Sequence, residues 1–204
     1  MTSVLTWTER LEAMLPELID FRRHLHSHPE LSGEEHQTAA LIAGALREAG
    51  WRVREGVGRT GVVADLGPEQ GAKLGLRVDM DALPVEEHTG LPYASLRQGV
   101  MHACGHDLHS TIGLGVARLL AGEPERPVGL RLLFQPAEEL AMGARWMREA
   151  GATEGLDGLF GVHVFPSLPA GSIGVRSGSL TAAAGELEIE VIGEGGHGAR
   201  PHQS

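Results

Sequence analysis

Three short apolar runs, separated by segments of helical periodicity, place the strongest constraint on the fold of this chain. They cover residues 73–78, 128–134 and 158–165. Continuous apolar runs of this length are typical of strands buried on both faces of a sheet, as in α/β proteins. The first run leads directly into Asp79 and Asp81, and open α/β sheets bind ligands outside the carboxyl ends of their strands. We therefore predict an α/β fold with a functional site at one edge of the sheet.

A candidate metal site surrounds Cys104, the only cysteine, which lies two residues before His106. A thiolate and an imidazole can bind one cation across this spacing because Gly105 tolerates the tight turn between them. Two ligands make only a weak site, so the prediction also depends on Glu139 and His163, supplied by the second and third apolar runs. Each side chain alone has an ordinary structural explanation, such as a buried filler or a solvated carboxylate. Their joint occurrence at the apolar runs favours a metal site.

Helical periodicity predicts four helices, over residues 8–25, 33–49, 107–121 and 143–150. We expect Pro16 to interrupt the first helix or to begin its second piece. The third helix would begin close to Cys104, and the partial positive charge of a helix N-terminus favours a thiolate. Histidines at spacing two on a helix do not share a face, so we expect surface or capping roles for a further trio: His24, His26 and His28.

The pattern changes in the last part of the chain. Residues 185–192 alternate between apolar and acidic side chains, which predicts an antiparallel strand with one solvated face, and 172–175 predicts a shorter strand. We place a domain boundary near 180–184. The interpretation is a catalytic, metal-binding domain over 1–181 and the beginning of a second domain over 182–204.

Composition excludes some classes of partner. The chain has 204 residues, a formal net charge of −10 and Lys73 as its only lysine, so it offers no basic stripe for nucleic acid. One cysteine cannot form an internal disulfide. The first residues lack the features of a secretory signal, and no apolar run approaches the roughly 20 residues of a membrane span. We expect a cytoplasmic protein that binds neither nucleic acid nor membrane.

Four motifs, in the same order along the chain, carry a resemblance to a known family. They are Arg77-Val78-Asp79-Met80-Asp81-Ala82-Leu83-Pro84, His102-Ala103-Cys104-Gly105-His106-Asp107, Gln135-Pro136-Ala137-Glu138-Glu139 and Gly195-Gly196-His197-Gly198-Ala199-Arg200-Pro201-His202. The chain resembles the metal-dependent N-acyl-amino-acid amidohydrolases of the aminoacylase and carboxypeptidase G family, which include hippurate hydrolase, N-acetyldiaminopimelate deacetylase and the indoleacetyl-amino-acid hydrolases. The resemblance implies a dinuclear-metal, exopeptidase-like catalytic domain with a central, mostly parallel sheet flanked by helices. The start of an α+β dimerisation or lid domain would follow.

The resemblance also implies a set of metal ligands. Cys104 would bridge two divalent metal ions, His106 and His163 would complete one site, and Glu139 would serve the other. The residue types leave zinc, manganese and cobalt open. The expected substrate is a small N-acyl amino acid, and the expected assembly is a homodimer.

Three further residues receive catalytic roles by resemblance. Glu138 would be the general base that accepts a proton from water and passes it to the leaving amine. Asp81, alone or with Asp79, would orient a ligand imidazole. His197 would stabilise the oxyanion, often across the dimer.

The family pattern continues beyond the last residue of this chain. Family members extend for about as many residues again and return to the catalytic domain with a last histidine ligand. We therefore expect a fragment or truncated product, with a lone lid strand as an exposed edge. The sequence favours hydrolysis of N-acyl amino acids. Two alternatives stay open: a catalytically silent metal-binding or interaction module, and a dipeptidase or carboxypeptidase that uses the same machinery.

Overall fold

The computed structural model describes residues 6–123, 125–182, 187–190, 192–193, 195–200 and 202. The chain divides into two units, Met1–Val164 and Phe165–Ser204. None of the described helices combines the length and the apolar character that a membrane crossing requires.

The first unit is built on a five-stranded sheet with the strand order β1-β2-β4-β3-β5. β3 runs parallel to β4 and β5, whereas β2 runs antiparallel to β4 and β1. Four of these strands therefore point in one direction, and the predicted α/β fold with a mostly parallel central sheet is confirmed. The strands are β1 (Arg52–Arg54), β2 (Val62–Leu66), β3 (Lys73–Asp79), β4 (Gly129–Gln135) and β5 (Gly158–Gly161), and the helices are α1 (Trp7–Ser27), α2 (His36–Glu48), α3 (His106–Ala121) and α4 (Gly143–Glu149).

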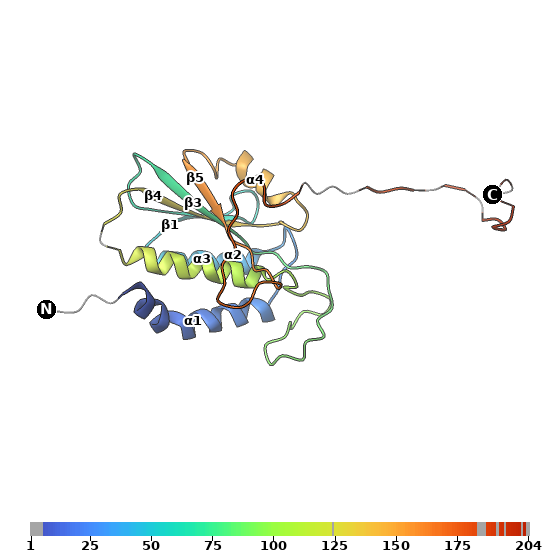
Figure 1. The fold of residues 1–204 in the computed structure, drawn as a ribbon, viewed down its shortest axis with the longest axis horizontal. Coiled ribbons are helices and arrows are strands. Elements are labelled where there is room, and N and C mark those ends of the chain that lie inside the picture. Colours follow the sequence, from blue (N-terminus) through green and yellow to red (C-terminus); the bar gives the residue numbers. More distant parts are fainter. Residues whose placement is uncertain are drawn as a thin grey trace. The chain divides into compact units, whose positions relative to one another are not determined.

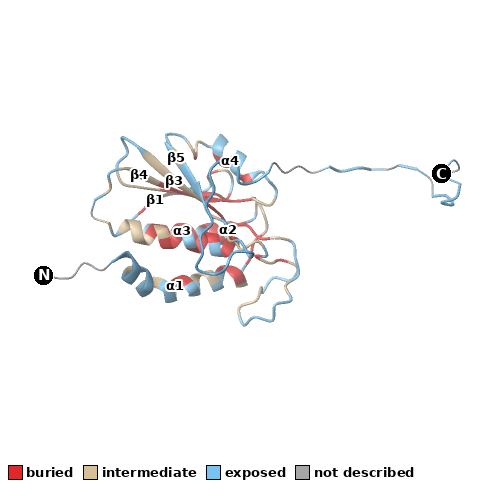
Figure 2. Ribbon diagram, viewed as in Figure 1, coloured by how far each residue is buried: buried red, intermediate tan, exposed pale blue. Residues whose placement is uncertain are grey.

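Helices cover both faces of this sheet, with α1, α2 and α3 on one side and α4 on the other (Figure 1). Successive strand residues point to opposite faces. Val62 and Phe134 belong to the larger core, which contains residues of α1, α2 and α3. Val63 and Leu133 pack instead with Met147 of α4. Buried residues accordingly gather on the strands and on the helix surfaces that face them (Figure 2).

The first helix departs from the sequence prediction in two ways. α1 continues through Pro16, so the predicted interruption is wrong. Proline removes one backbone hydrogen bond, but Leu18 and Leu25 bury their side chains beyond it and keep the helix on the core. The expectation for the histidine trio also fails at His26, which is buried and lies 2.8 Å from an oxygen of Asp107.

The parallel strands bring distant parts of the chain to one edge of the sheet. Asp79 is the last residue of β3, Gln135 is the last residue of β4, and β5 ends at Gly161. α3 begins at His106. His163 lies two residues beyond β5, not inside a strand as predicted, because this edge strand pairs only with β3 and is short. The carboxyl ends of β4, β3 and β5 therefore deliver the predicted polar residues to the same region.

The second unit lacks the predicted strands in its described part. Residues 172–175 form no strand, and Ile173 and Val175 are about nine-tenths exposed. The described residues 187–190 of the longer predicted strand also form no strand, and residues 185, 186 and 191 lie outside the described part. A strand needs a neighbour for its backbone groups and a surface for its apolar side. The described residues of this unit provide neither.

Candidate metal centre

The four predicted ligand side chains lie together at the edge of the sheet. Cys104 Sγ, a ring nitrogen of His106 and a carboxylate oxygen of Glu139 all lie within 4.8 Å of one another. His163 Nε2 lies 3.6 Å from Cys104 Sγ. Ligands bound to one zinc ion at about 2.0–2.3 Å stand roughly 3–4 Å apart, so these separations suit cations held between the side chains. We call these four residues the ligand cluster.

Gly105 shapes the turn that joins two members of this cluster. Its φ of +84° lies in the left-handed region, which glycine adopts without the steric cost that other residues incur. A Cβ atom added there would lie 2.7 Å from Cγ2 of Val164, which follows His163 in the chain. Glycine is therefore required both by the backbone angle and by the close approach of the His163 segment.

Asp81 fixes the orientation of the His106 ring and the start of the Glu139 segment. His106 Nδ1 lies 2.9 Å from Asp81 O and 3.1 Å from Asp81 Oδ1, so this nitrogen donates. The backbone N–H of Glu139 donates to Asp81 Oδ2 at 3.1 Å, and the hydroxyl of Ser32 donates to the same oxygen at 2.7 Å. The ring is thereby held with Nε2 directed toward the ligand cluster.

Two atoms of the ligand cluster are buried without a hydrogen-bond partner among the described residues. They are His106 Nε2 and Glu139 Oε1, which lie 3.7 Å apart. Buried polar atoms are nearly always paired, so an orphaned pair needs an explanation. Burial lowers the pKa of His106, but the hydrogen bond to Asp81 and the charges of Asp79, Asp81 and Glu139 raise it overall. In the neutral ring, with Nδ1 donating to Asp81, Nε2 carries a free lone pair, and both atoms can coordinate a cation. The residues present therefore fit a divalent metal ion.

The pKa values of two side chains in the ligand cluster, Cys104 and Glu139, are raised in the chain without a metal. Burial and the nearby carboxylates of Glu139, Glu138 and Asp79 raise the pKa of the Cys104 thiol to about 12. The expectation that the start of α3 would favour the thiolate is wrong for the chain alone, because a helix N-terminus contributes only about 0.3–1 kcal/mol at exposed positions. Burial and the charge of Glu138 also raise the pKa of Glu139. A bound cation would reverse both effects, since it favours deprotonated ligands.

The adjacent glutamates differ in exposure. The Glu139 side chain is 22% exposed and the Glu138 side chain is 38% exposed, and Glu138 Oε2 lies 3.8 Å from His106 Nε2. Glu138 therefore borders the same space but keeps more contact with solvent. The turn before it contains Ala137 at a φ of +45°, and the buried carboxylate of Glu35 accepts a hydrogen bond from Ala137 N–H at 2.8 Å. Glu35 was missed by the sequence analysis because nothing near it in sequence signals this contact.

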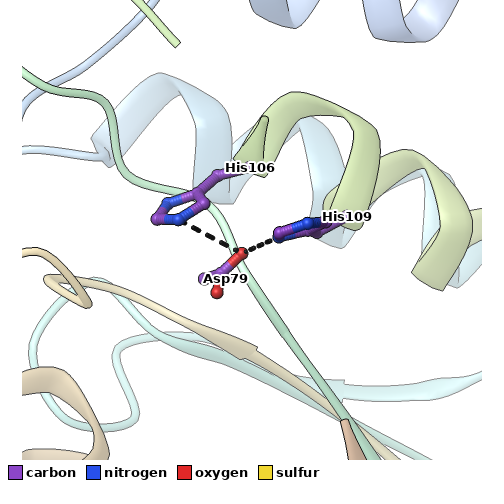
Figure 3. A group of neighbouring side chains, drawn as sticks. All are labelled: Asp79, His106 and His109. Carbon is purple, nitrogen blue, oxygen red and sulfur yellow. Dashed lines mark hydrogen bonds and ion pairs between the residues drawn. The ribbon is translucent and has the colours of Figure 1, made fainter. Parts of the chain in front are cut away.

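A second buried group lies beside the ligand cluster and is shown in Figure 3. His106 and His109 both project from α3 toward Asp79, whose Oδ1 lies 2.6 Å from His109 Nδ1 and 3.7 Å from His106 Nε2. His109 Nε2 accepts a hydrogen bond from the backbone N–H of Val164 at 2.8 Å. Both nitrogens of His109 are thus engaged, and neither is free for a cation. His109 had no predicted role, although its three-residue spacing from His106 places both side chains on one face of a helix.

His197, the remaining predicted site residue, belongs to the second unit. Its ring is exposed, and Nδ1 accepts a hydrogen bond from the backbone N–H of Ala199 at 3.2 Å. Its predicted contact with the oxyanion stays a prediction.

Comparisons with known proteins identify the family of this chain. The model of the peptidase family M20/M25/M40 matches residues 75–202. A probable hydrolase from Synechocystis is 55% identical over 95% of this chain and 50% of its own length. The N-acetyl-L-cysteine deacetylase of Bacillus subtilis is 46% identical over 94% of this chain and 47% of its own length. The chain thus spans about half the length of these curated relatives.

A crystal structure shows the same architecture. The YXEP protein of Bacillus subtilis, described as a dinuclear metal-binding peptidase of the M20 family, aligns with a TM-score of 0.78 and 45% identity. The alignment covers 82% of this chain and 48% of that protein.

Proposed function

This chain belongs to the peptidase family M20/M25/M40, and on that premise we propose that it forms the metal-binding part of an enzyme that hydrolyses the amide bond of N-acyl amino acids. The observation that carries the proposal is the pair of buried, unpartnered atoms, His106 Nε2 and Glu139 Oε1, within reach of the Cys104 thiol. Buried nitrogen and oxygen atoms that have no hydrogen-bond partner, at the carboxyl ends of parallel strands, suit cation binding better than they suit a structural core.

Cys104, His106, Glu139 and His163 would hold two divalent ions of zinc, manganese or cobalt. Bound divalent cations supply Lewis acidity, which polarises the acyl carbonyl and lowers the pKa of water. The protein's own part is to fix the ligand geometry, and Asp81 does so through its hydrogen bonds to His106 and to the Glu139 backbone.

Glu138 would act as the general base. It borders the ligand cluster and is more exposed than Glu139, so its carboxylate can face both a water molecule and the substrate. It would accept a proton from the attacking water and then deliver that proton to the departing amine nitrogen. His197 would donate a hydrogen bond to the developing oxyanion, in a homodimer. The homodimer and the cytoplasmic location remain predictions.

A second candidate is peptide-bond hydrolysis with the same residues. It is favoured by the peptidase name of the matching family and by the description of YXEP as a peptidase. The relative named as a deacetylase supports N-acyl amino acids instead. Relative kcat/KM values for N-acetyl amino acids, N-benzoyl amino acids and dipeptides would decide between the two substrate classes. Stoichiometric metal with no turnover on any of them would instead indicate a silent metal-binding module.

The test of the proposal is Glu138→Gln in the protein that contains this chain. We expect kcat to fall by about 10²- to 10⁴-fold, the usual contribution of a general base. Metal content should stay at the wild-type level, because the orphaned oxygen that faces the ligand cluster belongs to Glu139. Glu149→Gln, on the exposed surface of α4, is the matched control and should leave kcat unchanged. Unchanged turnover in Glu138→Gln would remove Glu138 from this role.

A further inference from the structure

His109 occupies a central place beside the ligand cluster without being able to join it. Its side chain is fully buried, and its ring centroid lies 5.5 Å from that of His106 and 4.6 Å from that of His163. Both of its nitrogens already have partners at hydrogen-bond distance. A buried imidazole between two candidate ligands, with no free lone pair, has to act through what it contacts.

The contacts of His109 determine its tautomer. Asp79 Oδ2 lies 2.7 Å from Arg77 Nη1, and Asp79 Oδ1 lies 2.6 Å from His109 Nδ1. A carboxylate paired with an arginine accepts hydrogen bonds, so the ring proton lies on Nδ1. Nε2 then carries a lone pair, which accepts the backbone N–H of Val164 at 2.8 Å. Val164 N–H therefore donates to His109, His109 Nδ1–H donates to Asp79, and Asp79 forms an ion pair with Arg77.

Val164, which donates to His109, also contacts the neighbouring candidate ligand, His163. Val164 follows His163, and its carbonyl oxygen accepts a hydrogen bond from His163 Nδ1 at 2.6 Å. That bond leaves His163 Nε2 as the free nitrogen, 3.6 Å from Cys104 Sγ. His163 lies beyond the end of β5 and is exposed, so its backbone is not held by the strand ladder. The bond from Val164 N–H to His109 ties this segment to α3.

We infer that His109 is a positioning residue that sets the direction of the His163 ligand through the Val164 peptide, with Asp79 fixing its tautomer. The inference rests on the proposed metal site and adds a residue to it. Groups that orient metal ligands typically account for 10- to 100-fold in metal affinity. His109 would act on His163 through the backbone, as Asp81 acts on His106 through the ring.

The experiment measures Co²⁺ binding to the 204-residue chain by equilibrium dialysis and by the thiolate-to-cobalt absorption band, which reports Cys104 directly. We expect His109→Leu to bind Co²⁺ about 10- to 100-fold more weakly, because Val164 N–H loses its acceptor. His109→Gln should recover affinity to within about tenfold of wild type, since its side-chain carbonyl reaches the place of Nε2. The control Thr111→Val removes a buried hydroxyl whose one hydrogen bond to the described residues goes to the Asp107 carbonyl of its own helix, and should bind as wild type.

Two results would overturn the inference. One is wild-type Co²⁺ affinity and an unchanged absorption band in His109→Leu. The other is equal weakening in the Leu and Gln variants when both fold, because the lone pair toward Val164 would then not matter. If His109→Leu does not fold, ¹⁵N NMR of the wild-type chain provides the test: the inference requires the Nδ1–H tautomer of His109, and the Nε2–H tautomer would contradict it.

Failure of this inference can be told apart from failure of the proposed function. Metal binding that follows the expected order of variants, in a protein that hydrolyses no N-acyl amino acid, would overturn the function alone. Hydrolysis by the wild type together with unaltered Co²⁺ binding in His109→Leu would overturn the positioning role alone.

Discussion

Two clusters of buried polar side chains contain neighbouring residues of α3, one His106 and the other Asp107. The two clusters differ in how the charge of their carboxylates is neutralised. The ligand cluster around His106 contains a thiol and a carboxylate but no arginine or lysine, and two of its buried atoms have no hydrogen-bond partner among the described residues. In the His26 cluster, which we define as Arg22, His26, Glu87 and Asp107, Arg22 Nε and His26 Nδ1 each lie 2.8 Å from Asp107 Oδ2. Arg22 Nε and Asp107 Oδ1 also lack a hydrogen-bond partner among the described residues, but the guanidinium forms an ion pair with this carboxylate. The His26 cluster contains its own cation, the Arg22 guanidinium, whereas the ligand cluster has atoms that can coordinate a metal ion from solution.

This difference separates structural from functional polar burial. Buried carboxylates are costly unless they are paired. Asp107 meets that condition with residues of α1, and burial raises its pKa less than the hydrogen bond with His26 and the charges of His102, Arg22 and His26 lower it. The Cys104 thiol and the Glu139 carboxyl instead show raised pKa values. A metal ion should therefore change the ligand cluster strongly and the His26 cluster hardly at all.

The largest expected effect that tests this comparison is the loss of metal binding in Cys104→Ser. Removal of a direct ligand should weaken Zn²⁺ or Co²⁺ binding by more than the roughly 100-fold upper range for an orienting residue, because a neutral hydroxyl replaces a thiolate. Isothermal titration calorimetry on the 204-residue chain measures the change. His26→Gln is the matched control, and equal affinities in both variants would contradict the assignment of the ligand cluster.

Sequence alone located the ligand cluster because its signals are local. The Cys104–His106 spacing is short, and Glu139 follows an apolar run that could be recognised as a strand. The supporting contacts could not be found in this way, since His26 meets Asp107 across 81 residues and Glu35 meets Ala137 N–H across 102. Strand prediction failed at 172–175 for a related reason: alternation shows which side chains could share a face, but pairing depends on a neighbouring strand.

The second effect concerns stability and should appear in Arg22→Met. Removing one partner of a buried ion pair costs about 3–5 kcal/mol, and we expect a loss near 3 kcal/mol in the free energy of unfolding because the guanidinium is partly exposed. Metal affinity should stay within about twofold of wild type. Urea denaturation of the metal-free chain measures the loss. Arg23→Met is the matched control, because Arg23 lies over the same Tyr93 ring at 5.1 Å.

A clear loss of metal affinity in Arg22→Met, with the fold intact, would break the comparison. It would mean that the two neighbouring clusters are coupled through the first turn of α3.

The third effect is the pH dependence of metal affinity. Burial and neighbouring carboxylates raise the pKa of Cys104 to about 12, so the thiol keeps its proton at neutral pH in the metal-free chain. Binding as thiolate must release that proton, and affinity should therefore rise by at least about tenfold per pH unit. The pKa of His106 is raised as well, so a proton released from this ring would make the slope steeper. Co²⁺ titrations between pH 6.5 and 8 measure the slope. A flat profile would show that the thiol does not bind the metal as thiolate.

The smallest expected effect is the shift in the pKa of His26, which reports on the His26 cluster. The hydrogen bond to Asp107 raises the pKa of His26 more than burial and Arg22 lower it. A raised folded-state pKa means that protonation stabilises the fold: the contribution is fully present below the unfolded value of about 6.5 and is lost as pH rises through the folded value. NMR titration of the His26 ring should give a pKa above that of an unfolded histidine, with or without Zn²⁺, because this cluster balances its charge internally. A large shift on adding Zn²⁺ would show that the two clusters share one electrostatic environment, and the distinction drawn from Arg22 would fail.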